Sequence, residues 1–147
     1  MRNSQSLIKL RNLSHYQEQL RSADLARSLA EYHQARERLE QLQGYLKDYR
    51  KSHIGGSLSD LRNNREFSLK LSRAVEEQNT IVTQLEQRLK ACQQHWQISK
   101  KRRESVEQAC EDARQEALEA EEKTLQKDLE TYASRSIESA IFGDDDG

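Results

Sequence analysis

The chain has 147 residues, a length typical of a single domain, and a formal net charge of −1 at pH 7. Only 34% of its residues are hydrophobic and 5% aromatic, whereas 33% are charged and the mean hydropathy is −1.05, which excludes a compact globular core. A disordered chain and an elongated pair of helices both fit this composition, and the spacing of the apolar residues decides between them.

Residues 3–52 are predicted to form a first helix. Proline is absent from the whole sequence, and the dominant residue types are good helix formers. Residues that are apolar, with the exception of Arg36, recur every three or four positions in two runs, with a break in register near residues 23 to 25. The first run is Leu10, Leu13, Tyr16, Leu20 and Ala23, and the second is Leu25, Leu29, Tyr32, Arg36, Leu39, Leu42, Leu46 and Tyr49.

Residues 53–59 are predicted to form the turn that follows. The glycine pair Gly55-Gly56 is the strongest break in the sequence and suits the end of a helix, while Ser57 or Ser59 suits the cap of the next one. A hairpin is the simplest topology that results.

A second, longer helix is predicted over residues 60–137. Its seam alternates steps of four and three residues without a slip, which is typical of a left-handed coiled coil. The fold class is therefore all-α, with two long helices in an antiparallel coiled-coil hairpin. The seam is Leu71, Val75, Gln78, Val82, Leu85, Leu89, Cys92, Trp96, Ser99, Arg103, Val106, Cys110, Ala113, Ala117, Ala120 and Thr124.

The two predicted helices differ in length. Antiparallel pairing about the turn sets residue i opposite about residue 117 minus i, so Leu10 is expected near Val106 and the chain beyond about residue 115 has no partner. Residues 1–103 carry 20 basic and 11 acidic side chains, net +9, whereas residues 104–147 carry 4 and 14, net −10. The single domain is expected to span residues 1–142, and residues 143–147 to form a disordered acidic tail.

The sequence lacks the patterns of a catalytic, metal or cofactor site. Its four histidines are far apart, and Gly55-Gly56 is not followed by the lysine of a phosphate-binding loop. The basic run Lys100–Arg103 points all around its helix, so a solvated surface is favoured over nucleic-acid binding. Cys92 and Cys110 are expected to be reduced. No membrane-spanning run or secretory signal is present, which predicts a cytoplasmic protein without direct membrane insertion.

Aromatic residues near the turn form two stripes that come level with each other. The stripes are open to two interpretations, the core of the hairpin or a surface for a partner. For Leu42 and Leu71, which also lie in the seams, both are open, and for Tyr45, Phe67 and Ala74 a partner surface is favoured. The first stripe is Leu42, Tyr45 and Tyr49, and the second is Phe67, Leu71, Ala74 and Gln78.

The sequence resembles the FliJ family of flagellar export proteins over most of its length. The resemblance lies in the two stripes above, in Trp96 with Lys100-Lys101, and near both ends. The end motifs are Leu10-Arg-Asn-Leu13, and Gln126-Lys127 with Tyr132-Ala133 and Arg135.

The resemblance implies a rod-like central stalk for flagellar type III protein export. Its partners would be the hexameric export ATPase, which it stimulates, the cytoplasmic domain of the membrane export gate, and export chaperones. Its location would be peripheral, at the cytoplasmic face of the inner membrane. The gate-binding residues would be Leu42, Tyr45, Tyr49, Phe67, Leu71, Ala74 and Gln78, and the ring-binding residues Leu10, Leu13, Gln126, Lys127, Tyr132 and Arg135.

Two alternatives stay open at this point. One is the equivalent stalk of a virulence type III secretion system. The other is an export chaperone or a plain structural coiled coil that contacts no ATPase. An enzyme is not expected on either alternative, because no catalytic arrangement is present.

Overall fold

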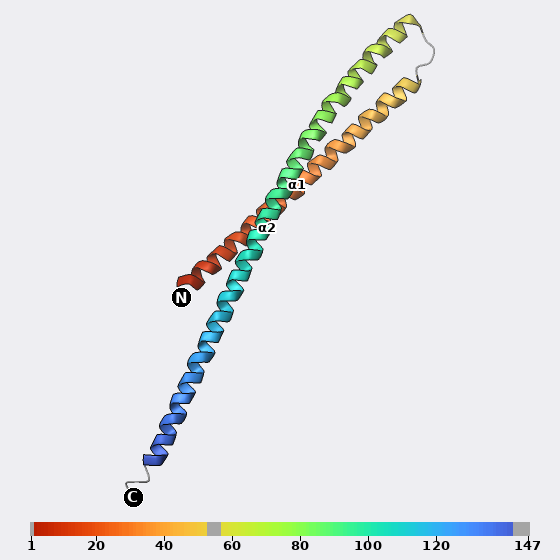
Figure 1. Cartoon of the computed structure of the whole chain (residues 1–147). Helices are drawn as coiled ribbons and strands as arrows, with labels where there is room; N and C mark the ends of the chain where they lie inside the picture. The colour runs from red at the N-terminus through yellow and green to blue at the C-terminus, as the bar shows by residue number, and fades with distance from the viewer. Residues whose placement is uncertain (1, 53–56, 143–147) are drawn as a thin grey trace. The chain divides into compact units, whose positions relative to one another are not determined.

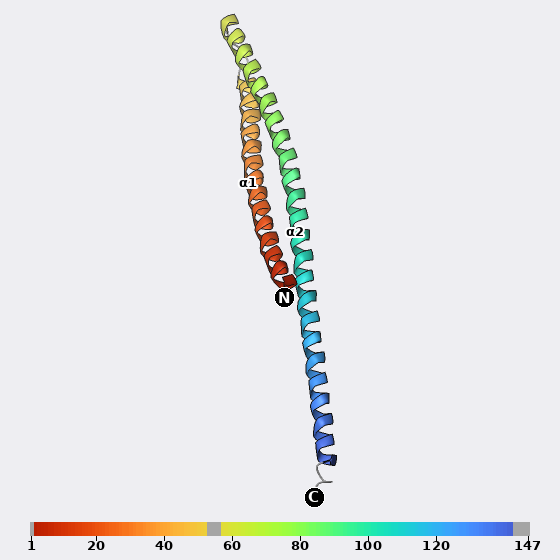
Figure 2. The ribbon, with the colours of Figure 1, turned by 90° about the vertical axis from the view of Figure 1, so that its left-hand side faces the viewer.

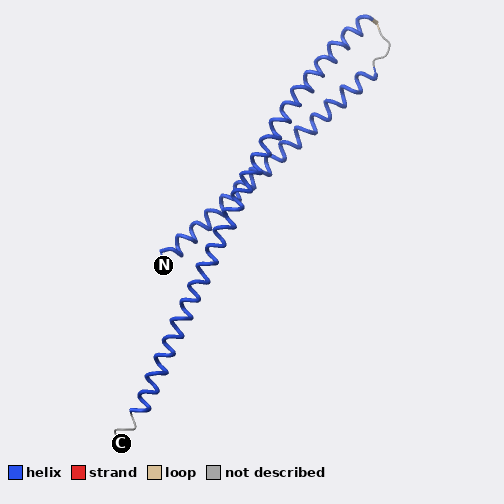
Figure 3. The backbone as a smooth tube through the Cα atoms, viewed as in Figure 1, coloured by secondary structure: helices blue, strands red, loops and turns tan. Residues whose placement is uncertain are grey.

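The computed structural model describes residues 2–52 and 57–142, and over these residues the chain consists of two α-helices (Figure 1). Helix α1 spans Arg2–Ser52 and α2 spans Leu58–Phe142. The described residues contain no strand (Figure 3). The two helices pack against each other as a hairpin in which the second helix is the longer, so the predicted all-α fold class is confirmed.

The chain divides into two units. The hairpin unit is His15–Lys101, and the end unit combines Met1–Ser14 with Arg102–Gly147. In the hairpin unit α1 and α2 run antiparallel and lie side by side, as Figure 1 and the view turned by 90° in Figure 2 both show.

The contact seam of α2 follows the predicted pattern. In the hairpin unit every predicted seam position from Leu71 to Ser99 is buried or half-buried, and in the end unit the same holds from Arg103 to Ala113. The most buried of these positions are Gln78, Leu89 and Ser99, at 8% to 9% exposure. The strict alternation of four and three therefore identifies the inward face of this helix.

The predicted seam of α1 is partly wrong. Stepping back from Tyr49 by alternating three and four residues passes through Ala35, Ser28 and Glu18. These positions lie inward, and in the hairpin unit only Arg21 among the stepped positions is exposed. Continuing the same steps reaches Ser14 and Leu7 in the end unit, so the register does not break near residues 23 to 25. The predicted seam residues that are exposed instead are Leu10, Leu13, Tyr16, Leu20, Ala23, Leu29 and Arg36.

Helix α2 begins at a side-chain cap. The backbone N–H of Asp60 donates a hydrogen bond of 3.3 Å to the hydroxyl of Ser57, and the N–H of Leu61 donates one of 2.9 Å to the Ser57 carbonyl. The helix therefore starts at Leu58, slightly earlier than the expected position near residue 60. The glycine pair of the predicted turn and the predicted disordered tail, residues 143–147, lie outside the described residues.

In the end unit the first turns of α1 lie against α2. The thiol of Cys110 donates a hydrogen bond of 3.6 Å to the backbone carbonyl of Leu7, which fixes the level of the two segments. From Arg114 to Phe142 every residue of α2 is exposed. Arg114 and Ala117 still line a pocket with the first turns of α1, and beyond Ala117 no other helix lies beside α2 among the described residues.

Candidate partner-binding surfaces

The residues expected to bind the export gate lie together in the hairpin unit, and we call them the bend patch. They come from the last turns of α1 and the early turns of α2. Their exposure divides them into two groups: Tyr45 and Phe67 are exposed, whereas the others are half-buried or buried. The bend patch consists of Leu42, Tyr45, Tyr49, Phe67, Leu71, Ala74 and Gln78.

An aromatic pair holds the bend patch together. The rings of Tyr49 and Phe67 lie with their centroids 4.7 Å apart at an interplanar angle of 52°, a favourable tilted arrangement. The Tyr49 hydroxyl also donates a hydrogen bond of 2.7 Å to Oδ1 of Asn64 across the two helices. Phe67 is nevertheless 48% exposed, so part of its ring is available to a partner.

Tyr45 is the most exposed member of the bend patch, at 62%. It lies on α1 between Leu42 and Tyr49, both of which are half-buried. A large aromatic side chain that stays exposed beside a packed seam is typical of a protein contact site.

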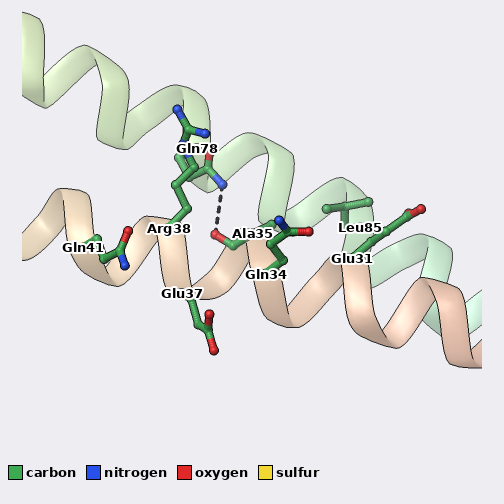
Figure 4. A pocket seen from close by; sticks show the side chains of 8 residues that line it. All are labelled: Glu31, Gln34, Ala35, Glu37, Arg38, Gln41, Gln78 and Leu85. Atoms are coloured by element: carbon green, nitrogen blue, oxygen red, sulfur yellow. Dashed lines mark hydrogen bonds between the residues drawn. The ribbon is translucent and has the colours of Figure 1, made fainter.

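Gln78 supports the bend patch from inside. Its side chain is 8% exposed and its amide donates a hydrogen bond of 2.9 Å to the backbone carbonyl of Ala35, as Figure 4 shows. In this position it is not accessible to a partner, which differs from the expectation that it belongs to the contact surface. We therefore assign Gln78 to the packing of the two helices.

An open groove of about 580 Å³ extends from the bend patch along the hairpin unit. Both helices line it, as Figure 4 shows: Gln78 and Leu85 come from α2, and Glu31, Gln34, Ala35, Glu37, Arg38 and Gln41 come from α1. The groove is lined by both polar and apolar side chains, so it suits a protein segment better than a small apolar ligand.

Sequence reasoning missed Ile81, which is 43% exposed on α2. It follows Phe67 and Ala74 at intervals of seven residues, so all three lie in one row on the helix. The seven-residue interval is visible in the sequence and could have placed Ile81 in the same row as Phe67.

The residues expected to bind the ATPase ring all lie in the end unit, and their described side chains are exposed. Leu10 and Leu13 are 47% and 50% exposed, and Tyr132 is 74% exposed. The contact of Leu7 with Cys110 agrees with the expectation that Leu10 lies near the level of Val106. The remaining ring-binding residues, Gln126, Lys127 and Arg135, are also exposed.

These ring-binding residues form two separate groups. Leu10 lies one turn from Leu7, which contacts Cys110 of α2. Gln126 lies a further 16 residues along α2 from Cys110, or about 24 Å at 1.5 Å per residue. The structure therefore does not bring Leu10 and Leu13 together with the group from Gln126 to Arg135.

An ion pair lies on α2 close to the level at which α1 begins. The Arg114 guanidinium donates hydrogen bonds of 2.7 and 3.2 Å to the carboxylate of Glu111. The hydrogen bond and then the charge of Arg114 lower the pKa of Glu111, and the same contact raises the pKa of Arg114. As a solvent-exposed pair within one helix, it contributes little to stability.

The described residues also bear on two further properties, a metal site and a membrane span. Within residues 2–52 and 57–142, the His, Cys, Asp and Glu side chains nowhere gather in a group that could hold a metal ion. Neither helix, over its described length, has an apolar stretch that could cross a lipid bilayer. Both cysteines are free thiols, half-buried in the seam of α2.

Comparison with known proteins gives one family. The model of the flagellar FliJ protein family matches residues 3–139, which is most of the chain. No curated protein and no solved structure matches it. With a match of this extent and a helical hairpin whose second helix is the longer, the chain belongs to the flagellar FliJ protein family.

Proposed function

We propose that this flagellar export component acts as a stalk that binds and stimulates the hexameric export ATPase through its end unit and contacts the membrane export gate through its bend patch. The gate contact is with the cytoplasmic domain, which places the protein at the cytoplasmic face of the inner membrane. The family assignment favours the flagellar system over a virulence system, and an export component over an enzyme.

The single observation that carries the proposal is the bare segment of α2. Every residue from Arg114 to Phe142 is exposed, including Leu118, Leu125 and Leu129. Most of the stability of a helix in a protein comes from packing of one face against a neighbour, so a partner that covers the apolar side chains of this segment would stabilise it. A hexameric ring has a central opening that can surround a single helix, which supports the assignment of this segment to the ATPase.

The bend patch supports the second contact. Exposed aromatic side chains on a packed support are the usual anchors of protein interfaces, and Tyr45 and Phe67 meet that description. Neither residue lies in the end unit. A protein with two separate contact surfaces suits a component that couples two partners.

Deletion of residues 115–147 tests the proposal. We expect the shortened chain to lose stimulation of the purified export ATPase and to keep its affinity for the gate domain, because the bend patch is untouched. Deletion of residues 143–147 alone is the matched control and should leave both properties unchanged. If the shortened chain stimulates the ATPase as well as the full chain does, the assignment of the end unit is wrong.

A further inference from the structure

Two rows of side chains follow one edge of the hairpin unit, and we call them the bend edge. On α2 the row is Phe67, Ala74 and Ile81, each directly before a seam residue. On α1 the row is Arg38 and Tyr45, again each directly before a seam residue. In an antiparallel coiled coil, positions of this kind on the two helices flank the seam on the same side.

An ion pair confirms that the two rows share an edge. Stepping seven residues further along the rows gives Glu31 on α1 and Arg88 on α2. The guanidinium nitrogen of Arg88 lies 3.8 Å from a carboxylate oxygen of Glu31. The bend edge therefore runs from Phe67 to this pair.

The opposite edge of the same stretch is polar. Its positions directly follow every second seam residue, at intervals of seven, and none of them from Arg36 to Arg50 on α1 or from Arg65 to Asn79 on α2 is apolar. Of the two edges that flank the seam in this stretch, the edge with Phe67 and Ile81 is therefore the apolar one. The exposed Leu58, Leu61 and Leu69 of α2 lie off this edge. The residues of the polar edge are Arg36, Gln43 and Arg50 on α1, and Arg65, Ser72 and Asn79 on α2.

We propose that the bend edge binds an amphipathic helix of the export gate's cytoplasmic domain, with Ile81 as an additional apolar anchor and Arg38 as the partner of a carboxylate. This inference rests on the proposed function and extends the gate contact beyond the bend patch. It gives a role to the part of the edge between Ala74 and the Glu31–Arg88 pair.

The spacing of the anchors favours a helix as the occupant. Seven residues of α-helix rise about 10.5 Å, so apolar residues at a seven-residue interval on a second helix meet Phe67, Ala74 and Ile81 in turn. Residues on one face of an extended strand recur about every 6.7 Å and fall out of step with these anchors. A helix of about 15 residues covers the row from Phe67 to Ile81.

The charge at the edge favours a carboxylate on the occupant. Glu31 and Arg88 satisfy each other, whereas Arg38 has no ion-pair partner among the described residues. Figure 4 shows Arg38 reaching across the groove toward α2, and Glu37 of the same helix also lines the groove. The neighbouring Glu37, Asp48, Lys70 and Glu77 lie beside the two rows and are mixed in sign. Between Phe67 and the Glu31–Arg88 pair, Arg38 is the charged side chain on the rows themselves, so it sets the preference.

Binding of the purified gate domain to the full-length chain tests the inference. We expect Ile81→Ala to raise the dissociation constant about tenfold, because it removes a partly exposed anchor. Arg38→Glu is expected to raise it at least as much, because it opposes two carboxylates. Matched controls are Ile98→Ala, which changes a 53% exposed isoleucine outside the edge, and Arg36→Glu on the polar edge. Both controls should stay within about twofold of the unchanged chain.

The outcomes separate this inference from the proposed function. If the gate domain binds, and Tyr45→Ala weakens it while Ile81→Ala and Arg38→Glu do not, the extended helix contact is wrong and the bend patch stands. If the gate domain does not bind the unchanged chain at all, the proposed function fails. If Ile81→Ala instead converts a dimer of the chain to a monomer in sedimentation, the edge binds a second copy and the inference is overturned.

Discussion

The side-chain amide of Gln78 on α2 donates a hydrogen bond of 2.9 Å to the backbone carbonyl oxygen of Ala35 on α1. Ala35 is small enough to let the two helices approach at this level, and both side chains are 8% exposed. A polar side chain in a coiled-coil seam costs stability relative to leucine but selects one register, because any other register leaves its amide unsatisfied. The pair therefore sets the register of the hairpin unit.

Replacement of Gln78 by alanine is expected to lower the free energy of unfolding by about 1–2 kcal/mol, because it removes a buried hydrogen bond and the packing around it. Urea denaturation followed by circular dichroism measures the loss. Gln84→Ala, at an exposed position of the same helix, is the matched control and should lie within about 0.5 kcal/mol of the unchanged chain. Equal effects at the two positions would show that the hydrogen bond does not contribute.

Ser28 leads to a prediction of the opposite sign. Its side chain is 3% exposed, and its hydroxyl oxygen has no hydrogen-bond partner among the described residues. Ser28→Ala should therefore raise the free energy of unfolding by about 1 kcal/mol, since it removes a buried unsatisfied polar group. Ser22→Ala, at an exposed position of α1, reports the gain from helix propensity alone, at most about 0.5 kcal/mol. The prediction fails if Ser28→Ala gains no more than this control.

The seam of α2 could be predicted from the sequence because its apolar residues keep a strict alternation of four and three. The seam of α1 could not be predicted in full, because the positions that alternation requires hold Ser28 and Ala35, while leucine and arginine stand one residue later at Leu29 and Arg36. A seam traced through the apolar residues of α1, at any spacing of three or four, therefore drifts off the face that contacts α2. The regular seam of α2 determines which face of α1 packs against it, and this contact accommodates serine and alanine on α1.

The candidate surfaces could be predicted from the sequence in part. The residue types near the turn indicated a contact site, and the off-seam positions of Tyr45 and Phe67 indicated exposure. The inward position of Gln78 was already contained in the α2 seam, but its hydrogen bond to a backbone carbonyl has no signature in the sequence. Ile81 was not predicted because it is not aromatic and lies one residue from the seam, although it continues the seven-residue interval of Phe67 and Ala74.

The cap of α2 gives a local prediction. Ser57→Ala removes the hydroxyl that accepts the hydrogen bond from the Asp60 N–H, so the first turn of α2 should fray at a cost of about 1 kcal/mol. Hydrogen exchange at the amides of residues 58–61 measures the fraying directly. Ser59→Ala lies inside the helix and should leave exchange at these amides nearly unchanged. Faster exchange in the Ser59 variant than in the Ser57 variant would contradict the cap assignment.

The revised α1 seam can be tested with two leucines. Leu39 is 8% exposed, and Leu39→Ala should lower the free energy of unfolding by about 2–4 kcal/mol. Leu13 is 50% exposed, and Leu13→Ala should cost less than about 1 kcal/mol. Thermal or urea unfolding compares the two variants. Similar losses would restore Leu13 to the seam and withdraw it from the proposed ATPase contact.

The bend patch gives the prediction that separates a partner surface from a packed core. Tyr45→Ala should weaken gate-domain binding about tenfold or more while the midpoint of thermal unfolding changes little, because the side chain is 62% exposed. Phe67→Ala should weaken binding as well, but with a measurable loss of stability, since it also removes the ring contact with Tyr49. Calorimetric binding and circular dichroism on the same preparations distinguish the two effects. If Tyr45→Ala melts the helices and leaves binding unchanged, its ring belongs to the packing of the hairpin, and the gate contact must be sought on another surface.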